Sequence, residues 1–484
     1  MFTFSSIKQY HQFLASTSNG CTQAVQHYLA KIEENKHLNA YLEVYAEEAL
    51  AQAAQLDADR LAGKPLGKLH GVVCAIKDVI CYKGHKVSAS SKILEGFTSI
   101  YNATAVEKLL QEGAIIIGRN NCDEFAMGSS NENSAYGAVK NALDESRVPG
   151  GSSGGSAVAV QAGLCMFSLG SDTGGSVRQP ADFCGIIGIK PTYGRISRYG
   201  LIAYASSFDQ IGIFSTDIQD TALVLEVIAG ADDFDSTVSI KPVPSYSTKL
   251  NQSNTKYRLA YFKEVLEHEG LDKEIATTIK AYIAKLQAEG HTVEPVDFNL
   301  LPYVVPTYYI LTTAEASSNL SRFDGVKFGY RADLKPSDDL TTMYKKTRSE
   351  GFGKEVQRRI LLGTFVLSSG YFDAYFTKAQ QVRRLLCDKT SEIFNSYDAI
   401  LCPTVPTTAF KIGEKSNDPI EMYLADIFTV FSNLVGVPSI SIPLFKHSNG
   451  MPFGLQLMSS HFEETKLLNI SEVLLGGGNY RHNS

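Results

Sequence analysis

The chain has 484 residues, of which 44% are hydrophobic and 20% are charged, as in ordinary soluble globular proteins. Its formal net charge of −6 argues against a surface that binds nucleic acid unaided, because phosphate binding needs clustered lysines and arginines. No run of eighteen apolar residues predicts a membrane span, and Met1–Lys8 lacks a signal-peptide pattern, so we expect a cytoplasmic protein. The length allows one large domain or two to three ordinary ones.

The first predicted element that carries chemistry is a buried strand over Gly71–Ile76, which places Lys77 at its end. Taken alone, this lysine either extends its amine to solvent or pairs with the adjacent Asp78. Burial lowers the pKa of a lysine, by up to about 3–5 units when it is complete, and a neutral amine can then act as a base. His70 precedes the strand and is interpreted as a loop or core residue.

Helix and strand patterns alternate through the first 230 residues. Thr104-Ala105-Val106-Glu107 has the pattern of a capping box and predicts a helix that ends near Gly113. Ala114–Gly118 then predicts a fully buried strand. A helix over about Gly155–Ala162 and a strand over Leu164–Leu169 continue the alternation. Active sites of α/β proteins collect in the loops at the ends of such strands.

Two glycine-rich loops carry serines at these positions. They read Gly150-Gly151-Ser152-Ser153-Gly154-Gly155-Ser156 and Asp172-Thr173-Gly174-Gly175-Ser176. Glycine allows the backbone to approach a ligand closely. Ser176 precedes a short helix that we expect to begin near Pro180. The second loop therefore predicts an oxyanion hole made by the backbone N–H groups of Thr173, Gly174, Gly175 and Ser176.

A serine nucleophile needs a partner that accepts its proton. Since no histidine lies in or beside either loop, Lys77 is the candidate base if it is neutral, and Ser152 is a candidate relay between Lys77 and Ser176. An α/β-hydrolase is disfavoured, because its nucleophile turn requires a preceding strand and Asn141–Pro149 is polar. A phosphate-binding P-loop is disfavoured because no Gly-Lys-Ser/Thr follows Gly155-Ser156.

The stretch from about 232 to 256 is rich in Ser, Asp and Pro and is a candidate surface linker. The alternation resumes with a predicted strand over Tyr257–Phe262. One apolar helical stripe follows and ends at Gly290; it consists of Ile275, Ile279, Ile283 and Leu286. Near the end, Ser439–Leu444 and Phe453–Met458 flank Ser448-Asn449-Gly450 and predict a hairpin. We therefore favour one continuous α/β unit with helical additions over two independent domains.

The eight cysteines are scattered and form no Cys-x-x-Cys pair. Most lie in apolar surroundings, as Cys74 and Cys165 do, which predicts buried free thiols in a reducing compartment. Without paired Cys and His spacing, the sequence does not predict a zinc site.

At this point the chain resembles the amidase-signature hydrolases. The resemblance is carried by Gly71–Asp78, Asn120–Ser130, Gly150–Val158 and Asp172–Ala181. It implies a triad of Lys77, Ser152 and Ser176, with a cis peptide bond between Gly151 and Ser152. It also implies a single domain over residues 1–484, an α/β fold whose central mixed β-sheet is covered by helices on both faces.

Within that family, the chain is most similar to the glutamine-hydrolysing subunits of tRNA-dependent amidotransferases. Further runs carry this likeness: Asn121–Ser130, Lys190–Arg195, Ser197–Gly200, Ala314–Leu320, Ser349–Val356 and Leu362–Phe365. The likeness implies that ammonia from glutamine passes to a B subunit, which activates Glu-tRNA(Gln) or Asp-tRNA(Asn) with ATP and Mg²⁺. A small C subunit bridges the two. No cofactor or metal is expected in this chain, and tRNA contact is expected only through the partner.

The same likeness implies a glutamine pocket in the second half of the chain. Asp426 is expected to bind the α-amino group and Arg359 the α-carboxylate, although the adjacent Arg358 leaves that register open. Tyr308 or Tyr309 is expected to line the pocket. Cys122 stands where an apolar residue such as methionine is more usual in this subfamily. Two alternatives remain, a free-standing amidase for a small or acyl amide and a non-catalytic scaffold subunit.

Overall fold

The computed structural model describes residues 4, 6–250, 255–415 and 419–476. In this part of the chain one mixed sheet of eleven strands forms the core, in the order β1-β3-β2-β4-β6-β5-β10-β11-β9-β7-β8. The strands are β1 (Tyr41–Val44), β2 (Val73–Lys77), β3 (Ile115–Asn120), β4 (Phe167–Asp172), β5 (Ile187–Lys190), β6 (Gln210–Ser215), β7 (Arg258–Phe262), β8 (Thr292–Val296), β9 (Ala399–Pro403), β10 (Ser439–Lys446) and β11 (Pro452–Met458).

Parallel and antiparallel pairs alternate in blocks across the sheet. Strand β2 runs parallel to both β3 and β4, and β7 runs parallel to β8 and β9. The pairs between β4 and β11 in the sheet order are antiparallel, including the hairpin of β10 and β11 that the turn signal predicts. Strands β2 to β6 are buried along their whole length, and apolar residues and glycine predominate in β2, β3 and β5.

Helices cover both faces of the sheet, as expected, and a single large apolar core includes residues from the first helix to the last. The helices of the first half are α1 (Ile7–Ser16), α2 (Gly20–Glu34), α3 (Ala46–Leu61), α4 (Thr104–Gln111), α5 (Gly154–Gln161), α6 (Arg178–Cys184), α7 (Ile218–Ile228) and α8 (Tyr246–Lys249). Those of the second half are α9 (Lys263–Leu266), α10 (Lys273–Ala288), α11 (Leu301–Asn319), α12 (Leu340–Gly351), α13 (Lys354–Val366), α14 (Lys378–Phe394), α15 (Pro419–Leu424), α16 (Val430–Val435) and α17 (Glu464–Leu474).

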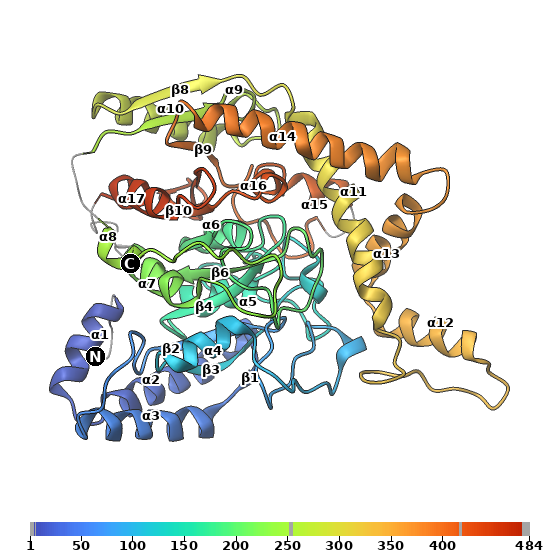
Figure 1. Cartoon of the computed structure of the whole chain (residues 1–484), viewed down its shortest axis with the longest axis horizontal. Helices are drawn as coiled ribbons and strands as arrows, with labels where there is room; N and C mark the ends of the chain where they lie inside the picture. Colours follow the sequence, from blue (N-terminus) through green and yellow to red (C-terminus); the bar gives the residue numbers. More distant parts are fainter. Residues whose placement is uncertain (1–3, 5, 251–254, 416–418, 477–484) are drawn as a thin grey trace.

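Helices α11, α12 and α13 extend to one side of the sheet, at the right of Figure 1. We call α11, α12, α13 and the π-helical turn Asp373–Thr377 the arm. Its two long helices pack closely, because Gly363 of α13 lies against the carbonyl of Thr313 in α11, where a Cβ atom would collide. The arm is therefore a packed helical projection at one side of the sheet.

Several predicted boundaries differ from the structure. Helix α4 begins at Thr104, but Thr104 is a helical residue, and its hydroxyl donates to Asp232 instead of capping the helix. The predicted capping box is therefore wrong. Strand β4 begins three residues later than the predicted Leu164, because the chain first turns at Gly163, where φ is +65°. Helix α6 begins at Arg178, two residues before the expected start.

The candidate linker packs against the first half of the chain. Tyr246 is fully buried in α8, and its hydroxyl accepts a hydrogen bond of 2.7 Å from Arg195 Nε. The Arg195 guanidinium also donates to the carbonyl oxygens of Lys241 and Pro242, at 3.1 and 2.9 Å. Residues 251–254 of the candidate linker lie outside the described residues. Up to residue 250, this stretch is held by specific polar contacts.

Candidate active site

Lys77 is the last residue of β2 and is completely buried. The sequence left two interpretations of this lysine, extension of its amine to solvent and pairing with Asp78, and the structure supports neither. Its amine does not reach solvent, and Asp78 does not pair with it, because that carboxylate lies 2.5 Å from Arg119 and accepts hydrogen bonds from Ser88 and Ser90. The strand thus places an ammonium-type group in the interior, with no ion-pair partner in contact among the described residues.

Three serine hydroxyls surround the Lys77 amine. Its Nζ atom lies 2.7 Å from Ser152 Oγ, 2.8 Å from Ser153 Oγ and 2.9 Å from Ser171 Oγ. Burial lowers the pKa of Lys77 to about 8, although the more distant Asp123 and Asp172 act in the opposite direction. A substantial fraction of this amine is therefore neutral near physiological pH, as a general base requires.

The loop that carries Ser152 is held by Asp123 from one side and by α6 from the other. The Gly151–Ser152 peptide bond is cis, as the family resemblance implied. Gly151 donates its N–H to Gln179 at 3.0 Å, and a Cβ atom on Gly151 would collide with the Asp123 carboxylate. Asp123 in turn donates its N–H to the Ser152 carbonyl oxygen at 3.0 Å. Only glycine fits at position 151.

The second loop turns around the carboxylate of Asp172, at the end of β4. This carboxylate accepts the N–H groups of Gly175 and Val177, at 2.9 and 3.1 Å, and two hydrogen bonds from Arg178. Burial opposes ionisation, but the Arg178 guanidinium holds the pKa of Asp172 well below its usual value. A side chain at Gly175 would collide with Thr429, whose hydroxyl donates to the Gly174 carbonyl oxygen at 2.7 Å.

This geometry changes the expected oxyanion hole. The N–H group of Gly175 is already bonded to Asp172 and is not available to a substrate. Within the described residues, no hydrogen bond engages the N–H groups of Thr173, Gly174 and Ser176. These three remain candidate donors to a developing oxyanion.

Ser176 is 9% exposed, which makes it more accessible than the fully buried Ser152. In the described part of the chain its hydroxyl makes no hydrogen bond, so the structure does not link it to Ser152. The two loops nevertheless share α6, since Gly151 bonds Gln179 and Gly150 packs against Pro180. The structure brings Lys77 and Ser152 into direct contact and places Ser176 at the start of the helix that supports their loop.

The four residues expected in a glutamine pocket lie close together, and one of them, Tyr308, contacts the second loop. Tyr308 and Tyr309 are buried in α11, and the Tyr308 hydroxyl lies where a Cβ atom on Gly174 would be. Tyr309 donates its hydroxyl to Asp426 at 3.1 Å. Asp426 also accepts from Ser129 at 2.7 Å, and burial raises its pKa to about 6.

The two neighbouring arginines have different environments. Arg359 is buried, donates to Glu355 at 2.8 Å and to Tyr204 at 2.8 Å, and lies within 5.5 Å of the ring centres of Tyr204 and Tyr309. Arg358 is half-exposed and pairs with Glu355. Arg359 thus points towards Asp426 and its tyrosines, whereas Arg358 points towards the surface.

A cavity of about 160 Å³ opens beside these groups. Both arginines line it, together with Glu355, Tyr423 and Ser130. Ser130 is buried, and its hydroxyl has no hydrogen-bond partner among the described residues. A polar substrate entering this cavity would meet two arginines and an unpaired hydroxyl.

Sequence reasoning missed several contributors to this site. Ser153 and Ser171 contact the amine but were not singled out as its partners. The sequence did offer a signal for both, because Ser153 is adjacent to Ser152 and Ser171 is adjacent to Asp172. Thr429 contacts the second loop from 255 residues further along the sequence, and Arg178, which supports the same loop locally, also donates to the Thr429 carbonyl oxygen. No local pattern marks such a contact.

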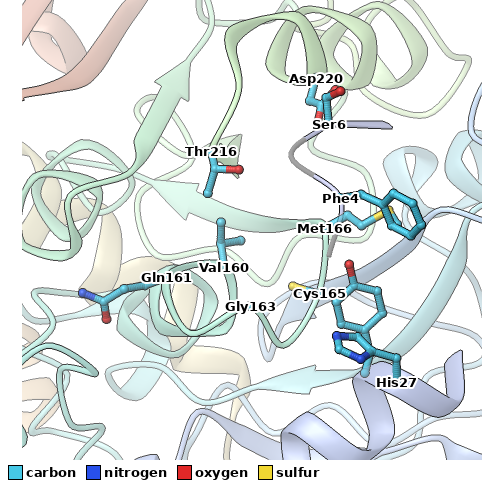
Figure 2. Close-up of a pocket in the computed structure, with 11 residues that line it drawn as sticks. Phe4, Ser6, His27, Val160, Gln161, Gly163, Cys165, Met166, Thr216 and Asp220 are labelled. Carbon is cyan, nitrogen blue, oxygen red and sulfur yellow. The ribbon is translucent and has the colours of Figure 1, made fainter. Parts of the chain in front are cut away.

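A larger cavity, of about 260 Å³, lies elsewhere (Figure 2). Val160 and Gln161 at the end of α5 line it, with Cys165 and Met166 before β4. The amine and its hydroxyls lie at the start of α5 and the end of β4, so the two sites occupy opposite ends of these elements. Asp220 borders the cavity and anchors the first turn of α1 by accepting the N–H of Ile7 at 3.0 Å.

Two features are absent from the described residues. No group of three or more His, Cys, Asp or Glu side chains is arranged to hold a metal ion in this part of the chain. None of the described helices is long and apolar enough to cross a membrane.

Comparisons with known proteins agree with this arrangement. The family model "Amidase" matches residues 23–468. The A subunit of glutamyl-tRNA(Gln) amidotransferase from Koribacter versatilis is 52% identical over 454 residues, which cover 94% of this chain and 94% of that protein. The protein of the same name from Chlorobium luteolum is 51% identical over 97% of this chain and 96% of its own length.

Solved structures show the same fold. The A subunit of glutamyl-tRNA(Gln) amidotransferase from Thermotoga maritima superposes with a TM-score of 0.81 at 37% identity, covering 99% of this chain and 96% of that one. Native peptide amidase from Stenotrophomonas maltophilia has the same TM-score of 0.81 at 27% identity, covering 98% of this chain and 97% of that one.

Proposed function

Because this chain belongs to the amidase family, we propose that it is the glutamine-hydrolysing subunit of a tRNA-dependent amidotransferase. The observation that carries the proposal is the buried Lys77 amine among three hydroxyls. A cavity lined by Arg359 also includes Ser130, whose backbone packs against Gly151 in the loop that carries Ser152. The relatives that are about half identical over nearly the full length are A subunits of glutamyl-tRNA(Gln) amidotransferase.

The contacts of the amine indicate how its lone pair is directed. Ser153 donates its hydroxyl hydrogen to the Ser171 carbonyl oxygen at 3.0 Å, so it can only accept from Lys77. A neutral amine has two N–H groups and one lone pair. We assign the two N–H groups to Ser153 and Ser171, which leaves the lone pair for the hydroxyl hydrogen of Ser152. Ser152 is then positioned to pass a proton to Lys77.

In the proposed reaction, Ser176 Oγ attacks the side-chain carboxamide carbon of glutamine. Its proton passes to Ser152 while the Ser152 proton passes to Lys77, and the free N–H groups of the second loop stabilise the oxyanion. The carbon–nitrogen bond then breaks as the leaving nitrogen takes a proton back along the same path. Ammonia and a γ-glutamyl ester of Ser176 result, and water hydrolyses the ester to glutamate by the reverse sequence.

We assign recognition of the α-amino and α-carboxylate groups of glutamine to the pocket residues Arg359 and Asp426. Arg359 binds the α-carboxylate, and ionised Asp426 binds the α-ammonium group. Buried Arg359 beside Asp426 favours an amino-acid substrate over the simple acyl amides of a free-standing amidase. Tyr308 and Tyr309 hold the wall between this pocket and the second loop.

The ammonia is consumed by a partner. We propose that a B subunit uses ATP and Mg²⁺ to activate Glu-tRNA(Gln), or Asp-tRNA(Asn), and that a C subunit stabilises the complex. This chain then needs no cofactor of its own and contacts tRNA only through the partner. The reaction uses aminoacyl-tRNA, so we expect the complex to work in the cytoplasm.

The test is ammonia release from glutamine by the full chain, alone and with B and C subunits, ATP, Mg²⁺ and Glu-tRNA(Gln). We expect release to rise on addition of all components and to match the Gln-tRNA(Gln) formed. An electrophilic glutamine analogue should label Ser176, as peptide mapping would show. Hydrolysis of peptide or acyl amides in preference to glutamine, with no effect of the partners, would instead identify a free-standing amidase.

A further inference from the structure

One group of exposed apolar side chains lies on α13 of the arm and in the turn that follows it. On α13, Leu361 is 71% exposed and Phe365 is 43% exposed. Two tyrosines after this helix, Tyr371 and Tyr375, are 44% and 39% exposed. Contiguous exposed apolar surface of this kind marks interaction sites, because a monomer gains nothing by leaving it in water.

These side chains form one surface. The Phe365 ring lies 4.4 Å from the Tyr371 ring and 5.8 Å from the Tyr375 ring, measured between centroids. Leu361 and Leu362 precede Phe365 by four and three residues, so they share its side of the helix. We call Leu361, Leu362, Phe365, Tyr371 and Tyr375 the arm patch. Clustered aromatic and leucine side chains are typical anchors of protein interfaces.

The arm patch continues into the rim of the candidate active site. Lys354, Arg358, Leu361 and Phe365 are spaced by four, three and four residues and therefore form one stripe along α13. The first two line the 160 Å³ cavity beside Arg359, and the last two belong to the patch. The opposite side of α13 is occupied by α11, since Gly363 packs against Thr313. A protein lying along this stripe would cover the patch and the rim together.

We propose that the arm patch is the docking surface for the subunit that consumes the ammonia. This inference rests on the proposed function, because only a reaction that hands ammonia to a second protein requires that protein to cover the rim of the site. The partner surface that fits is an apolar patch bordered by carboxylates, which would face Lys354 and Arg358. Docking there places the acceptor next to the glutamine pocket and closes the rim to water.

The test uses Leu361→Ser, Phe365→Ser and the double variant in the full chain, with affinity for purified B and C subunits as the readout. The matched control is Leu61→Ser, another leucine that is 64% exposed, in α3, which lies at the lower left of Figure 1, away from the arm at the right. We expect the dissociation constant to rise about tenfold or more for each arm variant and further for the double variant. The control should remain within about twofold of the wild type.

Two further measurements separate this inference from the proposed function. The isolated arm variants should keep the melting temperature and the basal glutamine hydrolysis of the wild-type chain, while the complex releases more free ammonia per Gln-tRNA(Gln). Unchanged affinity in the double variant, with glutamine-driven amidation intact, would overturn the docking surface and leave the proposed function standing. No glutamine hydrolysis by the wild-type chain with its partners would instead reject the proposed function.

The other occupant of the arm patch to be tested is a second copy of this chain. Light scattering of the isolated chain at micromolar concentration should give a monomer mass of about 52.8 kDa. A dimer that the Phe365→Ser variant dissociates would assign the arm patch to self-association and overturn the inference.

Discussion

The two sides of the candidate site use burial for opposite purposes. On the reaction side, the ends of β2 and β4 surround Lys77 with hydroxyls, and within the described residues no contacting carboxylate prevents burial from favouring the neutral amine. On the recognition side, α11 and α13 surround Arg359 with a carboxylate and aromatic rings, which keep the guanidinium charged. The same loss of water therefore creates a base in one place and preserves a cation in the other, and the contacting groups decide which.

The largest expected effect is on the reaction side. Ser176→Ala should lower glutamine-driven amidation by about 10⁴-fold or more, because it removes the attacking oxygen. Amidation driven by added ammonium should survive, since the partner's reaction does not use Ser176. Both rates are measured with the assembled complex. Loss of both would mean that Ser176 supports the assembly instead of the chemistry.

Removal of the base comes next. Lys77→Met should lower kcat for glutamine hydrolysis by roughly 10²–10⁴-fold, the range of general base catalysis, while the similar volume of methionine maintains packing. The matched control is Lys190→Met. Lys190 is also fully buried with a pKa lowered by burial to about 7, but it donates to the carbonyl oxygens of Pro191 and Val437.

The Lys190 variant should therefore lose stability, by about 1–3 kcal/mol for the unpaired carbonyl groups, with a smaller loss of kcat. Denaturant unfolding and steady-state kinetics measure the two quantities. Equal losses of kcat in both variants would show that a buried lysine matters here for folding and not as a base.

A smaller effect is expected on the recognition side. Arg359→Lys should raise KM for glutamine roughly 100-fold with little change in kcat, because lysine cannot reproduce planar, bidentate binding of a carboxylate. Arg358→Lys is the control on the adjacent residue and should change KM by less than about threefold. A reversed order would assign the α-carboxylate to the half-exposed arginine.

The smallest effect is a pH dependence that distinguishes the two sides. The neutral form of Lys77 is the active one and its pKa is about 8, so kcat/KM should rise with pH up to about 8 and then level off. Asp426 must be ionised to bind the α-ammonium group and has a pKa of about 6, which predicts a second, lower step. Asp426→Asn should abolish only the step near pH 6, as a pH series of initial rates would show.

The sequence predicted the contact between Lys77 and Ser152 because both residues lie in contiguous motifs, whereas the role of Ser176 stays a prediction. The strand before Lys77 and the two glycine loops are local patterns, and the structure brings Lys77 and Ser152 together at 2.7 Å. The pocket residues came instead from the family resemblance. Helix α13 shows no local sign that Arg359, and not Arg358, faces Asp426, because that depends on how α13 packs against α11.

The errors have physical causes as well. The predicted role of Gly175 as an oxyanion donor was wrong because Asp172, three residues earlier, accepts that N–H first. Thr104 matched a capping pattern, but Asp232 lies within reach of its hydroxyl and a distant contact replaced the local one. In both cases a carboxylate competed for a group that the local pattern had assigned elsewhere.

The hydrogen bonds of Arg178 have a consequence for how the protein is made. This side chain anchors the Asp172 loop, yet it also donates to the Thr429 carbonyl oxygen at 2.8 Å and to Asn433 at 2.6 Å, and it contacts Gln456. Those partners are 251 to 278 residues further along the chain. The chain must therefore be synthesised at least as far as Gln456 before the Asp172 loop can acquire all of these contacts. A nascent chain that ends before β11 lacks Gln456, so the side chain that anchors this loop is not yet fully bonded.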